Sequence, residues 1–215
     1  MILGINGHPR NEGTCRTLLE EALEGAAQEG AETLLVSVCE YHVRRCDFSE
    51  WCSSQPGCSI VDDMWKIYPL LAECTGLIVA APVAFAGVPS DLKAWIDRCN
   101  PFYKDRKIFH RNLFPYRPGA LIATAGSDRP ADFIGTIEPV RAFFFTLGVQ
   151  FEAQLIIGGL DTLPPPHPIP EHRTQARRIG AKIANLQNSE SARWQPDLPW
   201  WNHIPEDGGC SCRKK

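Results

Sequence analysis

The chain has 215 residues, of which 44% are hydrophobic and 22% are charged, with a formal net charge of −3. This balance is typical of a globular protein with a substantial core, and it argues against intrinsic disorder. The weak negative charge gives no electrostatic reason to expect binding to nucleic acid or to an anionic membrane. No run of eighteen apolar residues occurs, and the chain opens on strand-like residues without a basic leader. We therefore expect a cytoplasmic protein with no membrane partner.

Short apolar runs alternate with amphipathic ones along most of the chain. Continuous apolar runs are typical of buried strands, whereas apolar residues at every third or fourth position indicate helices. The apolar runs predict strands at 2–6, 32–38, 77–81, 120–125 and 150–157. The amphipathic runs predict helices at 14–28, from 62 onward, at 90–99, at 134–147 and at 171–186. Asp62 and Asp63 mark the start of the second predicted helix, because acidic side chains are favourable at the positive end of a helix.

Strand–helix alternation of this kind predicts right-handed crossovers and a doubly wound α/β sheet. Five strands match the flavodoxin-like fold, a parallel sheet in the order 2-1-3-4-5 whose ligands bind beyond the carboxyl ends of the strands. We expect this domain to span 1–188, with a cysteine-rich loop at 44–60 and a stiff proline-rich connector at 163–170. The pattern dissolves in 189–215, where we expect a C-terminal extension or arm that lies on another surface, such as a neighbouring subunit.

The loop between the first strand and the first helix runs from Gly7 to Cys15. A helix N-terminus presents unpaired N–H groups and the positive end of its dipole, which together favour a phosphate. Arg10 adds a guanidinium, Thr14 adds a hydroxyl, and Gly13 lets the backbone turn tightly. The loop has neither a Walker A nor a G-x-G-x-x-G sequence, so by itself it leaves phosphate binding and an ordinary turn equally open.

Two further loops follow predicted strands at the same edge of the sheet. The second loop consists of Pro82, Val83, Ala84, Phe85, Ala86 and Gly87, and the third of Thr124, Ala125, Gly126 and Ser127. Small residues in the third loop permit close backbone approach to a flat ring. Because the carboxyl ends of parallel strands meet at one edge, the three loops are predicted to converge on one ligand-binding crevice.

Over roughly residues 1–185, these loops resemble those of the NADPH-dependent FMN reductase group of flavodoxin-like proteins. The first loop of that group reads close to Gly-Ser-Pro-Arg-x-x-Gly-Asn-Thr, and here His8, Thr14 and Cys15 replace Ser, Asn and Thr. The second loop of that group reads something like Ser-Pro-Val-Tyr-Phe-Gly-Asn-Val, and the following helix, with Leu-Lys-Ala-Trp-Ile-Asp-Arg at 92–98, is a close match. The resemblance implies FMN, with backbone amides of the second loop along its pyrimidine edge. Because Cys15 is a weaker donor than Thr, either phosphate binding is weakened or His8 compensates.

Nine cysteines is a high count for a cytoplasmic chain, where clustered thiols indicate metal binding or redox chemistry rather than disulfides. Four cysteines fall in predicted helices or strands and are expected to be small packed hydrophobes, namely Cys15, Cys39, Cys74 and Cys99. Cys210 and Cys212 form a C-x-C pair in the polar tail. A terminal pair of this kind is more often unused than bound to a metal.

The loop after the second strand resembles the cluster motif of iron–sulfur flavoproteins, a subset of the same group. That motif is Cys-x2-Cys-x2-Cys-x5-Cys followed by Asp-Asp-Met, and this chain has Cys46, Ser49, Cys52 and Cys58 at the same spacing before Asp62-Asp63-Met64. Four thiolates are the usual ligands of a [4Fe-4S] cluster, because iron prefers soft sulfur donors.

With Ser49 in the second ligand position, several outcomes stay open. Three cysteines could hold a [4Fe-4S] cluster whose fourth iron binds Ser49, Asp47, water or a distant cysteine. They could instead hold a [3Fe-4S] cluster, or the loop could carry only metal-free thiols. A zinc site is a further alternative, although the paired C-x2-C knuckles typical of such sites are absent from the loop.

The sequence therefore predicts an FMN-dependent oxidoreductase or electron-transfer flavoprotein with an iron–sulfur cluster as its second cofactor. The expected electron donor is NAD(P)H or a ferredoxin-type protein, and the acceptor is a small molecule or a protein. The resemblance implies a homodimer or homotetramer. The alternatives are a cluster-free NAD(P)H:flavin or quinone reductase, a non-enzymatic flavin electron carrier, and a thiol-based metal scaffold without flavin. No acid–base residue stands out, so no catalytic side chain is predicted.

Overall fold

The computed structural model describes residues 1–109, 116–162, 168–189 and 200–202. Its centre is a five-stranded parallel sheet in the order β2-β1-β3-β4-β5. The strands are β1 (Ile2–Asn6), β2 (Thr33–Ser37), β3 (Gly76–Pro82), β4 (Arg117–Thr124) and β5 (Val149–Ile157). The predicted fold class and strand order are confirmed.

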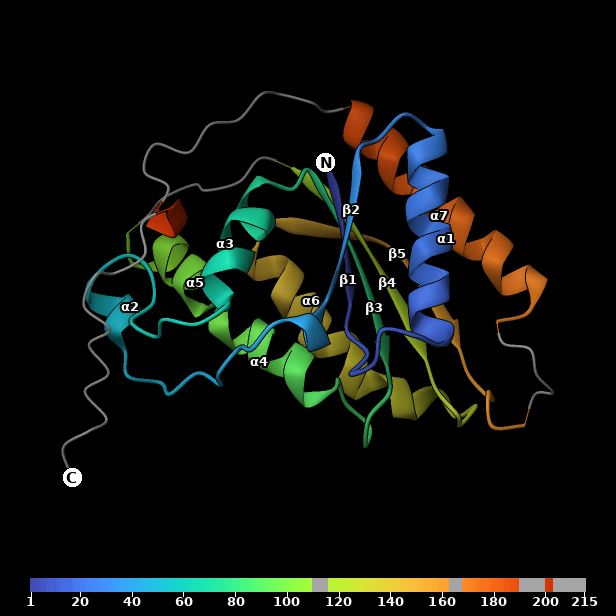
Figure 1. Cartoon of the computed structure of the whole chain (residues 1–215), viewed down its shortest axis with the longest axis horizontal. Helices are drawn as coiled ribbons and strands as arrows, with labels where there is room; N and C mark the ends of the chain where they lie inside the picture. Colours follow the sequence, from blue (N-terminus) through green and yellow to red (C-terminus); the bar gives the residue numbers. More distant parts are fainter. Residues whose placement is uncertain (110–115, 163–167, 190–199, 203–215) are drawn as a thin grey trace.

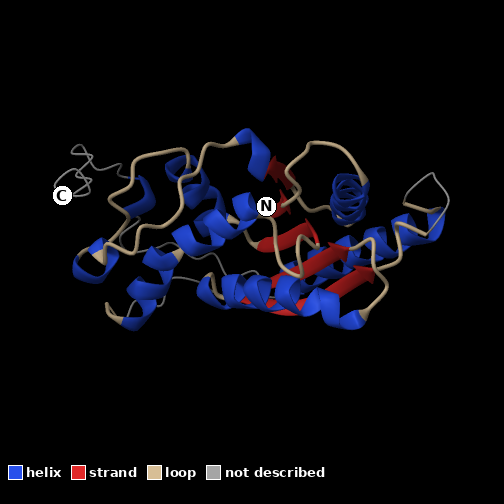
Figure 2. Cartoon of the chain, turned by 90° about the horizontal axis from the view of Figure 1, so that it is seen from below, coloured by secondary structure: helices blue, strands red, loops and turns tan. Residues whose placement is uncertain are grey.

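Helices cover both faces of the sheet, as Figures 1 and 2 show. One face carries α1 (Thr14–Gln28) and α7 (Pro170–Ser189), which pack against each other. The opposite face carries α3 (Met64–Glu73), α4 (Ser90–Arg98), α5 (Asn100–Lys107) and α6 (Ile134–Thr146). Each face buries its own apolar cluster, so the sheet lies between two hydrophobic layers.

Two helices were not predicted from the sequence. α2 (Trp51–Ser54) is a single turn inside the cysteine-rich loop, and it lies against α5. α5 was missed because most of its residues are polar, and Phe102 is one of the few buried members. Pro101 at its start is compatible with the first turn of a helix, where no backbone donor is needed. Short 3₁₀ turns lie at Val38–Glu40, Pro130–Phe133 and Trp200–Asn202.

The fourth strand begins at Arg117, three residues earlier than the apolar pattern predicted. Arg117 is almost fully buried, and its guanidinium donates to the carbonyls of Leu71, Ala72 and Cys74 at 2.8–3.1 Å. These carbonyls stand at the end of α3, where a helix leaves acceptors without intrahelical partners. Burial lowers the pKa of Arg117. A charged residue in this role breaks the apolar pattern by which a buried strand is recognised.

The described part of the C-terminal extension lies on the chain's own domain. Trp200 and Trp201 are 8% and 1% exposed. The Trp200 ring centroid is 5.0 Å from that of Tyr68 in α3 and 5.1 Å from that of Phe102 in α5. At these residues the extension packs into the aromatic cluster of its own domain. The rest of 189–215, and most of the connector at 163–170, lie outside the described residues.

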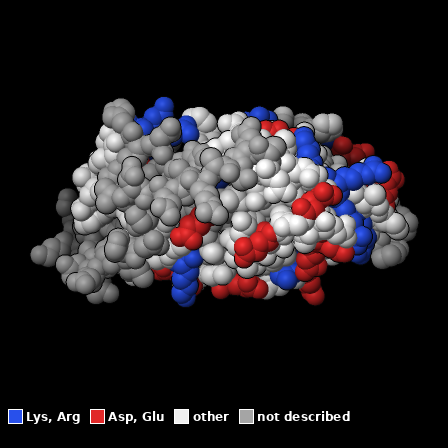
Figure 3. All heavy atoms as spheres, turned by 90° about the horizontal axis from the view of Figure 1, so that it is seen from above, with Lys and Arg blue, Asp and Glu red and all other residues white. Residues whose placement is uncertain are grey.

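The described surface has no large single-sign charge patch on the face shown in Figure 3, where acidic and basic side chains are interspersed. None of the described helices is long and apolar enough to cross a membrane.

Candidate functional site

The three predicted loops are joined by backbone hydrogen bonds at the carboxyl edge of the sheet. The Gly7 N–H donates to the Ala80 carbonyl at 2.7 Å, which ties the first loop to β3. The Val83 N–H donates to the Thr124 carbonyl at 2.8 Å, which ties the second loop to the third. Figure 1 shows these loops together at the lower edge of the sheet. A Cβ on Gly7 would lie 2.6 Å from a methyl group of Leu92 and 3.0 Å from the Ala80 carbonyl oxygen, so the loop and strand pack closely at this glycine.

The first loop leads into the N-terminus of α1, which has no side-chain cap among the described residues. Gly13 holds the N-cap position with φ of 104°, and no described side chain makes a capping hydrogen bond to α1. The first-turn N–H groups of Thr14, Cys15 and Arg16 therefore stand without a side-chain cap. The N–H groups of such a turn can donate hydrogen bonds to the oxygens of a phosphate. Arg10 is exposed beside this turn.

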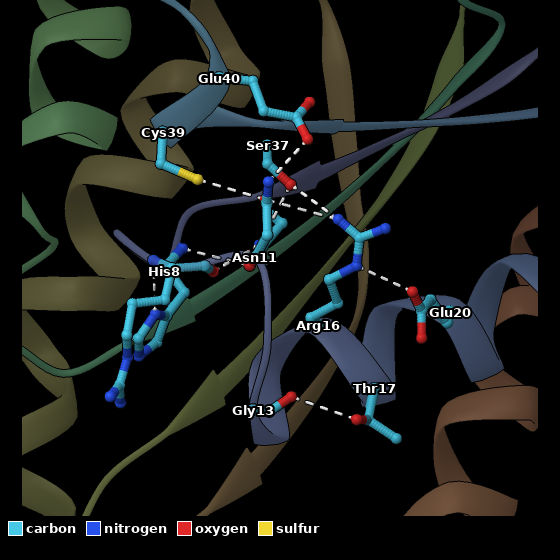
Figure 4. A network of polar contacts seen from close by, with 11 residues as sticks. His8, Asn11, Gly13, Arg16, Thr17, Glu20, Ser37, Cys39 and Glu40 are labelled. Carbon is cyan, nitrogen blue, oxygen red and sulfur yellow. Dashed lines mark hydrogen bonds and ion pairs between the residues drawn. The ribbon is translucent and has the colours of Figure 1, made fainter.

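A polar network, drawn in Figure 4, holds the first loop against the end of β2. Asn11 donates through Nδ2 to Glu40 Oε1 at 2.7 Å, and its Oδ1 accepts from Cys39 Sγ at 3.2 Å. Arg16 donates to Ser37 Oγ at 3.1 Å. The sequence did not identify these residues, because contacts between separate loops leave no local pattern. Cys39 is exposed, which corrects its expected role as a packed hydrophobe, since the 3₁₀ turn after β2 turns it toward the surface.

The side chains of Cys15 and Thr124 contact each other beneath the loops. The Sγ–Oγ1 distance is 3.0 Å, and both residues are buried. Burial raises the pKa of Cys15 to about 11, although the bond with Thr124 opposes the shift. The thiol is therefore neutral and directed at Thr124, which leaves the backbone N–H of Cys15 as its donor for a ligand. Cys74 and Cys99 are also buried, as expected for packed thiols.

His8 is partly buried at the mouth of the first loop. Its Nδ1 accepts from the Arg10 N–H at 3.0 Å, so the neutral imidazole carries its proton on Nε2. Burial first, and the charge of Arg10 second, lower the pKa of His8. A neutral imidazole with a free Nε2–H suits a hydrogen bond to an anionic oxygen.

The second loop forms a tight turn with a large apolar side chain at its tip. Ala84 and Gly87 exchange backbone hydrogen bonds of 2.8 and 3.0 Å, and between them Phe85 and Ala86 have φ of 47° and 60°. Two successive residues with positive φ define a type I′ turn, which is costly without glycine or asparagine. Phe85 is fully exposed. A strained turn that presents an aromatic ring to water indicates a surface made for a ligand or a partner.

The third loop approaches a carboxylate that the sequence did not indicate. A Cβ on Gly126 would lie 2.1 Å from Asp161 Oδ2, and the Asp161 N–H donates to the Gly126 carbonyl at 3.4 Å. Ser127 Oγ accepts from the Arg129 N–H at 3.2 Å and also bonds with Asp132. The close approach of Asp161 therefore already explains why a glycine stands at position 126, whether or not a bound ligand also needs the space.

The cysteine-rich loop surrounds a hollow with about 300 Å³ of empty space that opens to solvent. All four predicted cluster positions line it, namely Cys46, Ser49, Cys52 and Cys58. Asn100, the first residue of α5, donates to Cys52 Sγ at 3.3 Å. Burial raises the pKa of Cys46 and that of Cys52, and for Cys52 the neighbouring thiols of Cys58 and Cys46 add to the effect. We call this space the cysteine hollow.

The donors at the four predicted cluster positions of the cysteine hollow are three thiols and one hydroxyl. Within the described ranges, no three His, Cys, Asp or Glu side chains are arranged to hold one metal ion. The ligands of an iron–sulfur cluster bind different iron atoms and are usually thiolates. Thiols spread around a hollow are therefore the type of ligand that a cluster uses. The fourth donor, Ser49, is a hydroxyl and a harder ligand than thiolate.

Arg98, at the end of α4, donates hydrogen bonds to residues at both ends of the cysteine-rich loop. Its guanidinium donates to the Arg44 carbonyl at 2.9 Å and to the Ile60 carbonyl at 3.0 Å. It also pairs with Asp62 at 2.6 Å, and the two side chains are 0% and 6% exposed. Asp62 in turn accepts from the Arg44 N–H at 2.9 Å. Burial opposes the charge of Arg98, but the bond to Asp62 outweighs it and raises the pKa of Arg98.

Helix α4 connects the loop edge with the cysteine hollow. It starts at Ser90, directly after the second loop, and it ends at Asp97 and Arg98, which line the hollow. Nine helical residues span roughly 13 Å. Near its start, Leu92 contacts Gly7 of the first loop. The two candidate sites therefore lie at opposite ends of one rigid element.

Residues 1–134 match the family model described as NADPH-dependent FMN reductase. The chain belongs to this family. Membership makes it a flavin-dependent oxidoreductase and confirms the family that the sequence resembles. An iron–sulfur flavoprotein of Methanocaldococcus jannaschii is 31% identical over 160 residues, which cover 74% of this chain and 77% of the relative. One from Archaeoglobus fulgidus is 32% identical over 149 residues, which cover 69% and 73%.

Solved structures show that this member of the FMN reductase family shares its fold with other redox proteins. A flavone reductase superposes with a TM-score of 0.68 at 19% identity, over 91% of this chain and 66% of that chain. An NAD(P)H:quinone oxidoreductase from Methanothermobacter marburgensis gives 0.62 at 18% identity, over 85% and 98%.

Proposed function

We propose that the protein is an electron-transfer oxidoreductase that holds FMN on its three loops and an iron–sulfur cluster in its cysteine hollow. The observation that carries this proposal is the hydrogen-bonded convergence of the loops, joined by α4 to a hollow lined by three thiols. The sequence similarity to iron–sulfur flavoproteins supports the same assignment. The chain has the features of both sites in one domain.

The first loop binds the phosphate of FMN. The N–H groups of Thr14 and Cys15, the guanidinium of Arg10 and Nε2–H of His8 are its donors. His8 thereby compensates for the weak donor at Cys15. Gly13 is needed for its backbone conformation, because its φ of 104° excludes most side chains.

The second and third loops bind the flavin ring. Backbone groups of 82–87 line its polar edge, while the small residues of 124–127 let the backbone lie against it. Phe85 covers the ring from the tip of its turn. When bound, FMN supplies hydride and single-electron transfer, and the protein supplies orientation and electrostatics.

The cysteine hollow binds a [4Fe-4S] or [3Fe-4S] cluster through Cys46, Cys52 and Cys58. Such a cluster, when bound, supplies one-electron transfer. Asn100 donates a hydrogen bond to Cys52 Sγ, and a bond of this kind tunes a ligating sulfur. The thiols must lose their protons on binding, so we infer that loading is coupled to proton release.

The electron donor is NAD(P)H or a ferredoxin-type protein, and the acceptor is a small molecule or a protein. We propose a homodimer or homotetramer, because Phe48 and Phe85 are 75% and fully exposed and both stand at positive φ. Exposed apolar rings held at strained positions suit burial against another copy or a ligand. A cytoplasmic location fits the free thiols.

The proposal is tested by loading the protein anaerobically with FMN, iron and sulfide, and following NAD(P)H oxidation with quinones, free flavin and ferredoxin. Turnover that depends on bound FMN supports the oxidoreductase. A protein that accepts electrons only from reduced ferredoxin or dithionite is a carrier, which removes the enzymatic part of the proposal. Fewer than about one iron per chain after loading favours the cluster-free reductase.

Replacing Phe85 by Asn is expected to weaken FMN binding by about tenfold to a hundredfold, because the ring loses its apolar cover. Asn tolerates positive φ, so the turn is expected to be retained or relieved of strain. Phe85→Leu keeps the apolar bulk and serves as the matched variant, with a loss of about threefold. Quenching of flavin fluorescence measures both affinities. Equal affinities for wild type and Phe85→Asn would assign Phe85 to a protein partner instead.

A further inference from the structure

We propose that the iron facing Ser49 is an exchangeable site, at which the cluster binds a small external ligand through an oxygen atom. This inference rests on the cluster proposed above for the cysteine hollow, and it adds ligand binding to electron transfer. Three features of the described residues carry it: a hydroxyl at a thiolate position, a hollow that opens to solvent, and a buried arginine N–H without a partner.

The described residues bring three thiols to the hollow and no fourth. Cys46, Cys52 and Cys58 line it, together with Ser49. The other described thiols lie elsewhere. Three of them are 2%, 1% and 0% exposed in the core clusters and one bonds to Asn11 beside the first loop, namely Cys15, Cys74, Cys99 and Cys39. Among these residues, the fourth iron therefore meets an oxygen donor where its three neighbours meet thiolates.

The backbone places Ser49 at the wall of the hollow in an unusual conformation. Phe48 and Glu50, on either side of it, have φ of 53° and 59°. Left-handed conformations are unfavourable for such residues. The Ser49 N–H also donates to Asp47 Oδ1 at 3.1 Å, which engages one oxygen of the neighbouring carboxylate. The loop thus keeps the Ser49 hydroxyl, rather than this carboxylate oxygen, at the ligand position.

A hydroxyl at this position binds iron more weakly than a thiolate does. Iron in a cluster prefers soft sulfur donors, and the oxygen of a serine is a hard donor. An iron with a weak fourth ligand can act as a Lewis acid, which binds and polarises an oxygen-containing molecule. A carboxylate or hydroxyl of a small molecule can therefore displace the serine oxygen. This exchange replaces one oxygen ligand by another and needs no electron.

The hollow has room for a small ligand and an N–H group that suits an anion. Its empty space of about 300 Å³ opens to solvent, and the cluster takes up part of that space. Arg98 lines the hollow with a side chain that is 0% exposed, and its Nε–H has no partner among the described residues. Because buried donors are almost always paired, this N–H indicates an acceptor that those residues do not provide. A sulfide, a thiolate or a bound carboxylate in the hollow is a suitable acceptor.

The first experiment measures how firmly the fourth iron is held. Wild type and Ser49→Cys are loaded anaerobically with iron and sulfide and then treated with ferricyanide, which takes one electron from each cluster as a ferrous ion leaves. We expect wild type to fall from about four irons per chain to about three, with the EPR signal of an oxidised three-iron cluster, whereas Ser49→Cys keeps about four. Ferrous ion and dithionite should then restore the fourth iron in wild type. Circular dichroism checks that both proteins are folded.

The second experiment measures ligand binding independently of activity. The probe is glycolate, a small molecule with one hydroxyl and one carboxylate, and the readout is the EPR spectrum of the cluster reduced with dithionite. We expect glycolate to change the spectrum of wild type and that of Ser49→Ala, in which no hydroxyl competes for the iron. The spectrum of Ser49→Cys, the matched control with four thiolates, is expected to stay the same.

The outcomes separate this inference from the cluster on which it rests. Either a fourth iron that ferricyanide does not release or a wild-type spectrum that glycolate does not change would overturn the inference and leave the cluster in place. Three irons in wild type that added ferrous ion does not raise to four would also overturn it, because the exchangeable iron would not exist. A loaded wild type without iron would instead overturn the proposed cluster itself.

Discussion

Replacing Arg98 by Met is expected to lower the free energy of unfolding by about 3–5 kcal/mol, because it leaves the carboxylate of Asp62 buried without its cation. It also removes the bonds to the carbonyls of Arg44 and Ile60, which close the two ends of the cysteine-rich loop. We therefore expect iron loading to fall together with stability. Denaturant unfolding of the FMN-loaded protein and iron analysis measure the two effects.

Two further variants separate the buried charge from the lost loop contacts. Adding Asp62→Asn to Arg98→Met is expected to recover part of the stability, since the uncompensated charge disappears. Lys93→Met in the same helix breaks the ion pair with Asp97, whose side chains are 47% and 32% exposed, and should cost under about 1 kcal/mol. If Arg98→Met cost no more than Lys93→Met, the assignment of Arg98 as the clamp of the loop would be wrong.

Replacing Cys58 by Ser is expected to remove most of the iron from the loaded protein while FMN binding stays within about twofold. The hydroxyl nearly matches the thiol in size, so the packing of this side chain against the hydrophobic core persists. With Ser49 already present, only two thiolates of the loop would remain. The loss follows from the ligand chemistry, because iron clusters depend on soft sulfur donors. Iron and sulfide analysis and the visible spectrum after loading measure it.

Cys39→Ser is the matched control for this prediction. Cys39 is exposed and lies outside the cysteine hollow, and a serine hydroxyl can keep the bond to Asn11. Its iron content is expected to equal that of wild type. Equal iron in Cys58→Ser and wild type would show that the metal binds elsewhere in the protein.

The sequence predicted the layers of this fold because apolar runs and amphipathic periods are local properties. The predicted bounds of β1 and α1 agree with the structure, at Ile2–Asn6 and Thr14–Gln28. α5 could not be found in the same way, since its stability comes from Phe102 packing against the aromatic cluster. The predicted fourth strand began three residues later than β4 does, because a buried arginine at the start of β4 breaks the apolar pattern.

In the candidate sites, too, local sequence patterns could be predicted and tertiary contacts could not. Loop positions could be listed from their place after each strand, and the cysteine spacing could be read directly. The pairing of Asp62 with Arg98 could not be predicted, because the two residues are 36 positions apart. The family motifs drew attention to each residue but not to the contact between them. The position of Trp200 beside Gly57 is a tertiary contact without any periodic signal. Contacts between distant segments, rather than local patterns, decide how these sites are held.

We propose that three loops at one edge of the sheet form a binding site for FMN. Anaerobic titration of flavin-free protein with FMN, followed by gel filtration and absorbance, tests it most directly. We expect one FMN per chain, retained through filtration, with quenched flavin fluorescence. Protein that emerges folded but without flavin, after incubation with excess FMN, would contradict the assignment of the three loops.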